Sequence, residues 1–268
     1  MILLTLNYIR QLVRLIKLNN EEISDDFKLC WKAAGLHIQN QAQGNLQSWI
    51  RSHLLPPFLD HLSFRLGNQL FFIRIIDTNE LLETPGTLKG LQRIANACNG
   101  HACFMPMRKQ NGRWEPAESG WGMVDAISGK LINPLNLVTD ELIEMTDWEV
   151  QDFAIQVIKD KLALDGKKDI AWNNDPEVQP SIWFSSDNNA EWVVVKFSRW
   201  PEDMPSIPSN INDIAENLKE IKSKGNFAPI SIVNANDPFD PSAKISKNYL
   251  PLYRGHSLTF SYKGLIAL

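Results

Sequence analysis

The 268 residues suffice for one large domain or two small ones, and 44% hydrophobic and 22% charged residues are ordinary proportions for a globular protein. They exclude disordered and fibrous classes, and a formal net charge of −4 excludes the generally basic surface that nucleic-acid binding favours. The charge is uneven, because residues 1–134 have 14 basic and 11 acidic side chains (+3) and residues 135–268 have 13 and 20 (−7). Three cysteines are too few for a disulfide framework, so we expect a cytoplasmic protein.

The first 20 residues have the pattern of an amphipathic helix with a basic edge. Their positive charges follow the apolar positions, whereas a signal peptide has them first, and no run of about 18 apolar residues is present to span a membrane. We predict a packed terminal helix, with a membrane-surface helix as the alternative. The pattern consists of apolar Ile2, Leu6, Ile9, Val13 and Ile16 and basic Arg10, Arg14 and Lys17.

The rest of the chain reads as two copies of one unit, residues 21–136 and 137–268. Each copy has an apolar hairpin, a loop with proline, a helix that ends at a glycine suited to a C-cap (Gly100 and Gly225), and a buried strand. A last strand pair follows in each. The matching segments are 62–77 and 181–198 for the hairpins, 87–100 and 210–225 for the helices, and 101–107 and 226–234 for the strands.

A helix is expected before each hairpin. The first unit has helical segments at 21–35 and 46–55, and the second has one at 140–164 that Thr139 and Asp140 can cap. We therefore predict an α/β (α+β) fold of two tandem related helix–strand–helix–strand units, each a small mixed sheet with flanking helices. In this alignment Arg74 corresponds to Lys196.

The second unit resembles the core of the restriction-endonuclease-like PD-(D/E)XK superfamily, from the helix at 140–164 to the strand at 227–233. The resemblance implies an acidic residue near the start of one strand and an acid-x-Lys at the end of the next, with carboxylates that hold Mg²⁺. Lys196 stands at the lysine position, but Val194 stands where the acid before it is expected. Ser181 and Ile182 stand where the first metal-binding acid is expected.

Two acids near the missing positions leave a nuclease open as the alternative. Glu177 and Glu191 could act with Lys196 if the acids had migrated, although Glu191 is five residues before Lys196 and strand alternation points it to the opposite face. Small secretion-chaperone-like domains have nearly the same order of elements and bind protein segments. Fold alone does not separate these functions.

Cys98, His101 and Cys103 are the one cluster with metal-ligand spacing, C-x₂-H-x-C. A structural zinc site needs a fourth ligand, and a buried strand beside a helix end explains the two cysteines without a metal. The sequence has no G-x-G-x-x-G, G-x-x-x-x-G-K-[ST], G-x-S-x-G or H-E-x-x-H motif, so we expect no cofactor.

The sequence is rich in tryptophan, with nine tryptophans and four tyrosines, and this is the remaining indication of function. Trp183, Trp192 and Trp200 flank or lie in the second hairpin, and tryptophan is a preferred interface anchor as well as a core residue. We therefore hypothesise a cytoplasmic, bacterial-type, non-catalytic factor that binds another protein through these residues, as an immunity, adaptor or chaperone-like protein. The acidic second unit favours a basic protein partner over nucleic acid.

Overall fold

A computed structural model of the chain describes residues 24–43, 47–51, 61–173, 176, 178–186, 189–219 and 223–268. These residues form two compact units, an N-terminal one that ends at Ile143 and a C-terminal one that begins at Glu144. The expected helix at residues 1–20 lies outside the described residues. In the part of the chain that is described, no helix has the length and apolarity needed to cross a membrane.

The unit boundary lies seven residues after the predicted one, 136/137. The intervening segment packs on the first hairpin, since the Asn68 Nδ2 donates to Thr139 Oγ1 (2.9 Å) and to the Glu141 carbonyl oxygen (2.8 Å). The prediction that Thr139 caps a helix is wrong, because its side chain accepts a hydrogen bond from the hairpin instead.

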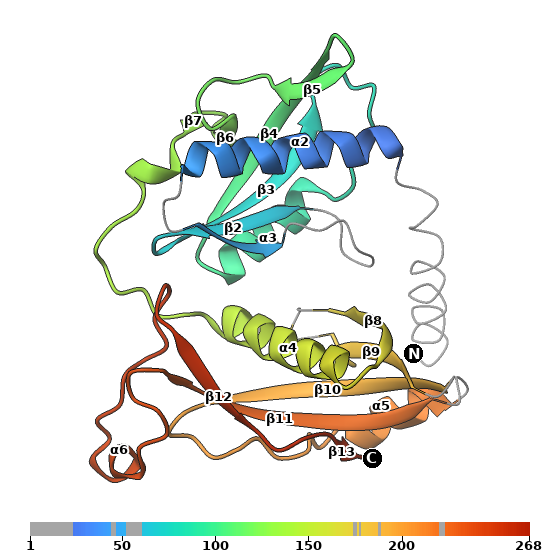
Figure 1. The fold of residues 1–268 in the computed structure, drawn as a ribbon, viewed down its shortest axis with the longest axis vertical. Helices are drawn as coiled ribbons and strands as arrows, with labels where there is room; N and C mark the ends of the chain where they lie inside the picture. The colour runs from blue at the N-terminus through green and yellow to red at the C-terminus, as the bar shows by residue number, and fades with distance from the viewer. Residues whose placement is uncertain are drawn as a thin grey trace. The chain divides into compact units, whose positions relative to one another are not determined.

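The N-terminal unit is a seven-stranded mixed sheet with a helix packed on it (Figure 1). The strand order is β1-β2-β3-β4-β6-β7 with β5 beside β4, and only β3 and β4 are parallel. The elements in chain order are α2 (Asp25–Ala42), β1 (Gln47–Arg51), β2 (Leu62–Leu66), β3 (Gln69–Asp77), α3 (Leu88–Ala97), β4 (His101–Gln110), β5 (Arg113–Pro116), β6 (Met123–Asp125), β7 (Leu131–Ile132) and the 3-10 helix η1 (Pro134–Asn136).

Two helix predictions in this unit are corrected by the structure. The segment expected to be helical at 46–55 contains β1, in which Trp49 pairs with Phe64 and their rings meet edge to face at 5.8 Å. The helix predicted over 21–35 begins at Asp25, where the Ser24 side chain caps it, and continues to Ala42. Burial against the sheet, which the local pattern does not reveal, decides both cases.

Gly35 lies inside α2 with nothing within 4 Å of where a Cβ would stand. Alanine loses less backbone entropy than glycine on folding, so we expect Gly35→Ala to raise the free energy of unfolding of the N-terminal unit by about 0.5–1 kcal/mol. Urea unfolding of the full chain measures this change. The control is Gly112→Ala, which also meets open space but at φ +77°, and which should be destabilising. Equal effects of the two substitutions would contradict the argument.

The C-terminal unit is a six-stranded mixed sheet of order β12-β11-β10-β9-β8 with β13 beside β11, and only β10 and β11 are parallel (Figure 1). The predicted helix start at residue 140 is wrong, because α4 begins at Asp147 with Thr146 as its N-cap. The elements are α4 (Asp147–Leu164), β8 (Lys168–Trp172), β9 (Ile182–Ser186), β10 (Asn189–Arg199), α5 (Ile211–Leu218), β11 (Lys224–Asn234), α6 (Pro241–Ser246), β12 (Leu258–Tyr262) and β13 (Ile266–Ala267).

Alternation along β10 divides this core between the two faces of the sheet. Val193 and Val195 pack in the cluster that contains α4, whereas Trp192 and Val194 pack in the cluster that contains α5. The apolar run of β10 is thus explained by helices on both sides, as is typical of the inner strands of such sheets.

Both units have the same plan: a helix, three antiparallel strands, a crossover helix, a strand parallel to the third, and further antiparallel strands. The predicted fold class, an α/β (α+β) chain of two tandem helix–strand–helix–strand units, is confirmed. Arg74 pairs with Phe104, the fourth residue after Gly100, and Lys196 pairs with Pro229, the fourth after Gly225. Arg74 and Lys196 therefore occupy corresponding positions when the strands are aligned on these glycines.

The two glycines are not the helix caps that the sequence predicted. Asn99, at φ 46°, is the left-handed residue after α3, and Gly225 lies inside β11. A Cβ on Gly100 would stand 2.9 Å from the Phe72 ring, and one on Gly225 would stand 2.4 Å from the Trp192 ring. In both units the glycine makes room for an aromatic side chain of the neighbouring strand.

Candidate functional site

Loops at the carboxyl ends of parallel strands are where open α/β sheets most often place ligands. In the C-terminal unit these loops are residues 200–210, after β10, and 235–257, after β11. Polar side chains lie at this end of the sheet on both of its faces. Arg199, Asn234, His256 and Arg254 are linked to each other's loops or to the start of α4, whereas Lys196 and Ser198 are on the opposite face of β10 from Arg199.

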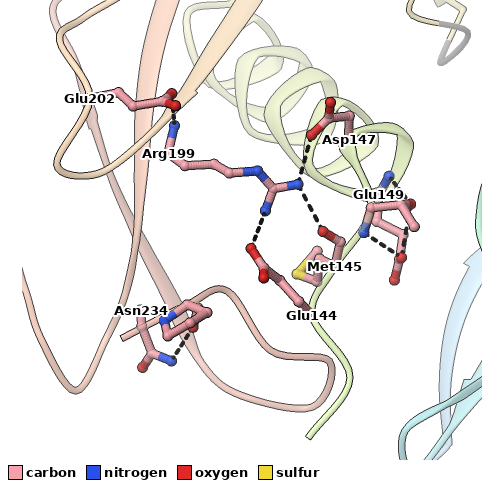
Figure 2. A network of polar contacts seen from close by, with 9 residues as sticks. Glu144, Met145, Asp147, Glu149, Arg199, Glu202 and Asn234 are labelled. Carbon is pink, nitrogen blue, oxygen red and sulfur yellow. Dashed lines mark hydrogen bonds and ion pairs between the residues drawn. The ribbon is translucent and has the colours of Figure 1, made fainter. Parts of the chain in front are cut away.

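Arg199 ties the end of β10 to the start of α4 (Figure 2). Its Nη2 donates to the Met145 carbonyl oxygen and to Asp147 Oδ1, each at 2.8 Å, and its Nη1 lies 3.6 Å from the Glu144 carboxylate. Figure 2 shows the guanidinium between these two carboxylates. The contact holds the strand end in place and leaves the side chain little freedom to do anything else.

Arg254 and Glu149 form a buried, bidentate ion pair, with side chains 1% and 6% exposed. Arg254 Nε donates to Glu149 Oε1 at 2.8 Å, and Nη2 donates to Oε2 at 2.9 Å. The same carboxylate accepts hydrogen bonds from the Thr146 backbone N–H and hydroxyl, which completes a capping box at the start of α4. One carboxylate therefore joins α4 to the loop before β12.

Asn234, fully buried at the end of β11, orders the loop that follows (Figure 2). Its Nδ2 donates to the Pro251 carbonyl oxygen (3.1 Å) and lies 3.3 Å from His256 Nδ1, while its Oδ1 accepts from the Asn236 N–H (3.1 Å). These polar groups build the loops rather than present themselves to solvent.

Lys196 differs from the residues around it. Among the described residues it has no hydrogen-bond or ion-pair partner, and partial burial lowers the pKa of its amine. The corresponding Arg74 of the N-terminal unit donates to the carbonyl oxygens of Thr84 and Pro85 and to Thr84 Oγ1. The same strand position is thus structural in one unit and unpartnered in the other.

The positions at which a nuclease of this type would carry its acids belong to the packing of the unit. Val194 is buried against α5, and Ser181 is buried with its Oγ accepting from the Val195 N–H (3.4 Å). Glu191 accepts a hydrogen bond from Asn226 Nδ2 (3.0 Å), and alternation places it on the face opposite Lys196. Glu177 lies outside the described residues. The structure does not bring Glu191 and Lys196 together.

The three candidate tryptophans are distributed differently from the prediction. Trp192 is 1% exposed in the core beneath α5, so it cannot be the exposed anchor that we expected. Trp183, its cross-strand neighbour, is half-buried against the same cluster. Trp200 is half-buried at the start of the 200–210 loop, where its ring meets Phe239 edge to face at 5.4 Å.

The two cysteines of the predicted cysteine–histidine cluster are buried packing residues. Cys103 is in the core beside α2, Cys98 caps α3, and both thiols are fully buried. His101 stacks on Phe71 and lies 3.0 Å from Gln69 Oε1. Burial raises the pKa of the Cys103 thiol. No group of three or more potential metal-ligating His, Cys, Asp or Glu side chains occurs in the described part of the chain.

The sequence pattern did not predict the Arg254–Glu149 pair or the pairing of Ser198 with Ser231. The order Thr146-x-x-Glu149 before an apolar helix is a capping-box signature and could have located the start of α4. Nothing local indicates that Arg254, 105 residues away, completes it.

No curated protein and no solved structure matches the chain. Residues 148–268, which begin in the first turn of α4, match a family described as a domain of unknown function (DUF8840).

Proposed function

We propose that the protein is a non-catalytic protein-binding factor, of the immunity, adaptor or chaperone-like kind, whose C-terminal unit is a degenerate PD-(D/E)XK-like scaffold. The order α4, β8, β9, β10, α5, β11, with β10 and β11 parallel, agrees with that resemblance. The proposal rests on Val194 and Ser181, because the positions of the metal-binding acids are filled by residues that pack the unit. We also take the two units as copies of one ancestral unit.

The binding surface, in this proposal, is the pair of loops after β10 and β11. Four large apolar side chains in them are exposed, namely Ile207 (45%), Ile245 (87%), Tyr249 (45%) and Leu250 (42%). The loops are joined by the Lys244 Nζ to Asp203 Oδ1 ion pair (2.5 Å) and by the Trp200–Phe239 ring contact. Exposed apolar side chains held together on ordered loops are typical of protein-interaction sites.

The charges on these loops favour a partner with basic side chains. The same loops contain the acidic residues Glu202, Asp203, Asp237 and Asp240. Lys244 is already paired with Asp203, which leaves Lys247 as a basic side chain to oppose them. An acidic rim speeds association with a basic partner and makes the rate depend on salt. The cytoplasm is the compartment that we propose, since no disulfide bond joins the three described cysteines, all of which are buried.

We expect Ile245→Asp to weaken partner binding by the full chain roughly thirtyfold or more, because an apolar anchor at the centre of an interface contributes about 2 kcal/mol or more. The measurement is affinity purification from cells of the source organism, followed by titration of the purified partner. Leu164→Asp, at a residue 80% exposed elsewhere in the unit, is the control and should bind normally. Equal affinity of the wild type and Ile245→Asp would refute this surface.

The same protein preparations test the nuclease alternative. DNA and RNA should remain intact in Mg²⁺ or Mn²⁺, since Val194 and Ser181 offer no carboxylate for the ion. Metal-dependent cleavage that Lys196→Ala abolishes would overturn the non-catalytic proposal. In that event, single changes of Glu177 and Glu191 would show which acid holds the metal.

A further inference from the structure

Two buried hydroxyl groups lie side by side near the carboxyl ends of β10 and β11. Ser198 (5% exposed) pairs directly with Ser231 (4% exposed), and Cα atoms on neighbouring strands are about 4.8 Å apart. Neither Oγ has a hydrogen-bond partner among the described residues. A buried polar group without a partner costs about 1–3 kcal/mol, and native proteins rarely leave two together.

Lys196 lies on the same face of the sheet, two residues before Ser198, at about 6.6 Å along the strand. Its amine is half-buried, and desolvation is the cause of its lowered pKa, without any contribution from a neighbouring charge. A partly buried ammonium normally has a counter-ion. Here none of the described carboxylates supplies one.

The N-terminal unit shows that the fold itself does not require this polar group. The residues that correspond to Ser198 and Ser231, at the same distance from the strand glycine, are Ile76 and Pro106, and they pair with each other in the same register. The residue that corresponds to Lys196 is Arg74, whose guanidinium is satisfied by the loop before α3. The two unpartnered hydroxyls and the unpartnered amine are thus specific to the C-terminal unit.

We propose that Lys196, Ser198 and Ser231 bind a small oxyanion, a carboxylate or a phosphate, at the carboxyl ends of β10 and β11. The ammonium supplies the opposite charge, and the two hydroxyls donate hydrogen bonds to the oxygen atoms of the anion. Binding would satisfy both orphaned hydroxyls and compensate for the desolvation of the amine. The site is independent of the exposed apolar surface, so either proposal can fail alone.

Thermal unfolding of the full chain in sodium phosphate, sodium acetate or sodium chloride at equal ionic strength tests the proposal. We expect a saturable stabilisation by phosphate or acetate over chloride, and the anion that acts identifies the source. Ser231→Ala should weaken binding about tenfold or more, and Lys196→Met should remove it. Lys263→Met removes an exposed charge in the same unit and should leave binding unchanged.

Two further measurements distinguish a ligand-binding site from a structural role of these residues. Ser231→Ala should keep or raise the stability of the anion-free protein, because it removes an unsatisfied buried group. Anion affinity should fall as pH rises through the lowered pKa of Lys196, since only the ammonium form attracts the anion. No stabilisation beyond chloride, or stabilisation that persists in Lys196→Met, would overturn the proposal and leave the hydroxyls to an ordered water.

Discussion

Replacing Arg254 by methionine is expected to lower the free energy of unfolding of the C-terminal unit by about 3–5 kcal/mol. The substitution leaves the Glu149 carboxylate buried without its two charged hydrogen bonds. The same carboxylate caps α4, so the substitution should destabilise both the start of this helix and the loop before β12. This ion pair joins segments that are 105 residues apart, and both of its side chains are buried.

The measurement is urea unfolding of the full chain, with amide hydrogen exchange of α4 to report the C-terminal unit by itself. Arg108→Met is the matched control, because the Arg108–Glu115 pair is 50% and 43% exposed and such pairs contribute about 1 kcal/mol or less. In the double variant Arg254→Met/Glu149→Gln the free energy of unfolding should fall by less than the sum of the decreases in the two single variants, since the double variant has no unpaired charge. The expectation would be contradicted if the decreases in the free energy of unfolding of the two single variants added up in the double variant, or if Arg254→Met cost no more than Arg108→Met.

Gly225→Ala should destabilise the C-terminal unit by about 1–3 kcal/mol. The new Cβ would stand 2.4 Å from Cζ2 and 2.6 Å from Cη2 of Trp192, which is closer than real contacts allow. Trp192 cannot swing away, because it is 1% exposed between the sheet and α5. The parallel pairing of β10 and β11 at this point must therefore open, or the ring must leave its place in the core.

Trp192→Phe provides the test of this mechanism. In the Gly225→Ala background the smaller ring should restore part of the lost stability, whereas in the wild type the same change should leave a cavity and destabilise. Chemical denaturation of the four proteins gives the coupling energy. A Gly225→Ala protein as stable as the wild type, or no coupling with Trp192→Phe, would show that the close approach does not constrain the fold.

Several features of the fold follow from short-range patterns and could be predicted from the sequence. Alternation at period two around Gly67-Asn68 produces the first hairpin, and the same pattern at 181–198 produces the second. The repeated order of hairpin, helix and buried strand is also visible without the structure. These features depend on the nearest neighbours in the chain, which act in the same way wherever the segment lies.

The candidate sites could be predicted only in part. The positions of Arg74 and Lys196 on corresponding strands follow from the repeat, and the absence of acids at Val194 and Ser181 is read directly from the residues. A tryptophan such as Trp192 is equally compatible with an interface and with a core, and the structure places its side chain in the core. The pairing of Ser198 with Ser231 depends on the register of two parallel strands, which are joined by a crossover and not by a local turn.

The sequence by itself determined the α/β class, the two tandem units, the hairpins and the crossover helices, because local periodicity and turn chemistry are enough for these. Only the tertiary structure decided that residues 47–51 form a strand, that the Thr139 side chain binds the first hairpin, and that Arg254 reaches Glu149. Thr139 is an acceptable helix cap in isolation, but a hairpin 71 residues away binds its side chain instead. Such choices depend on which surfaces become buried together, and that free energy is set by contacts between distant segments rather than by the segment itself.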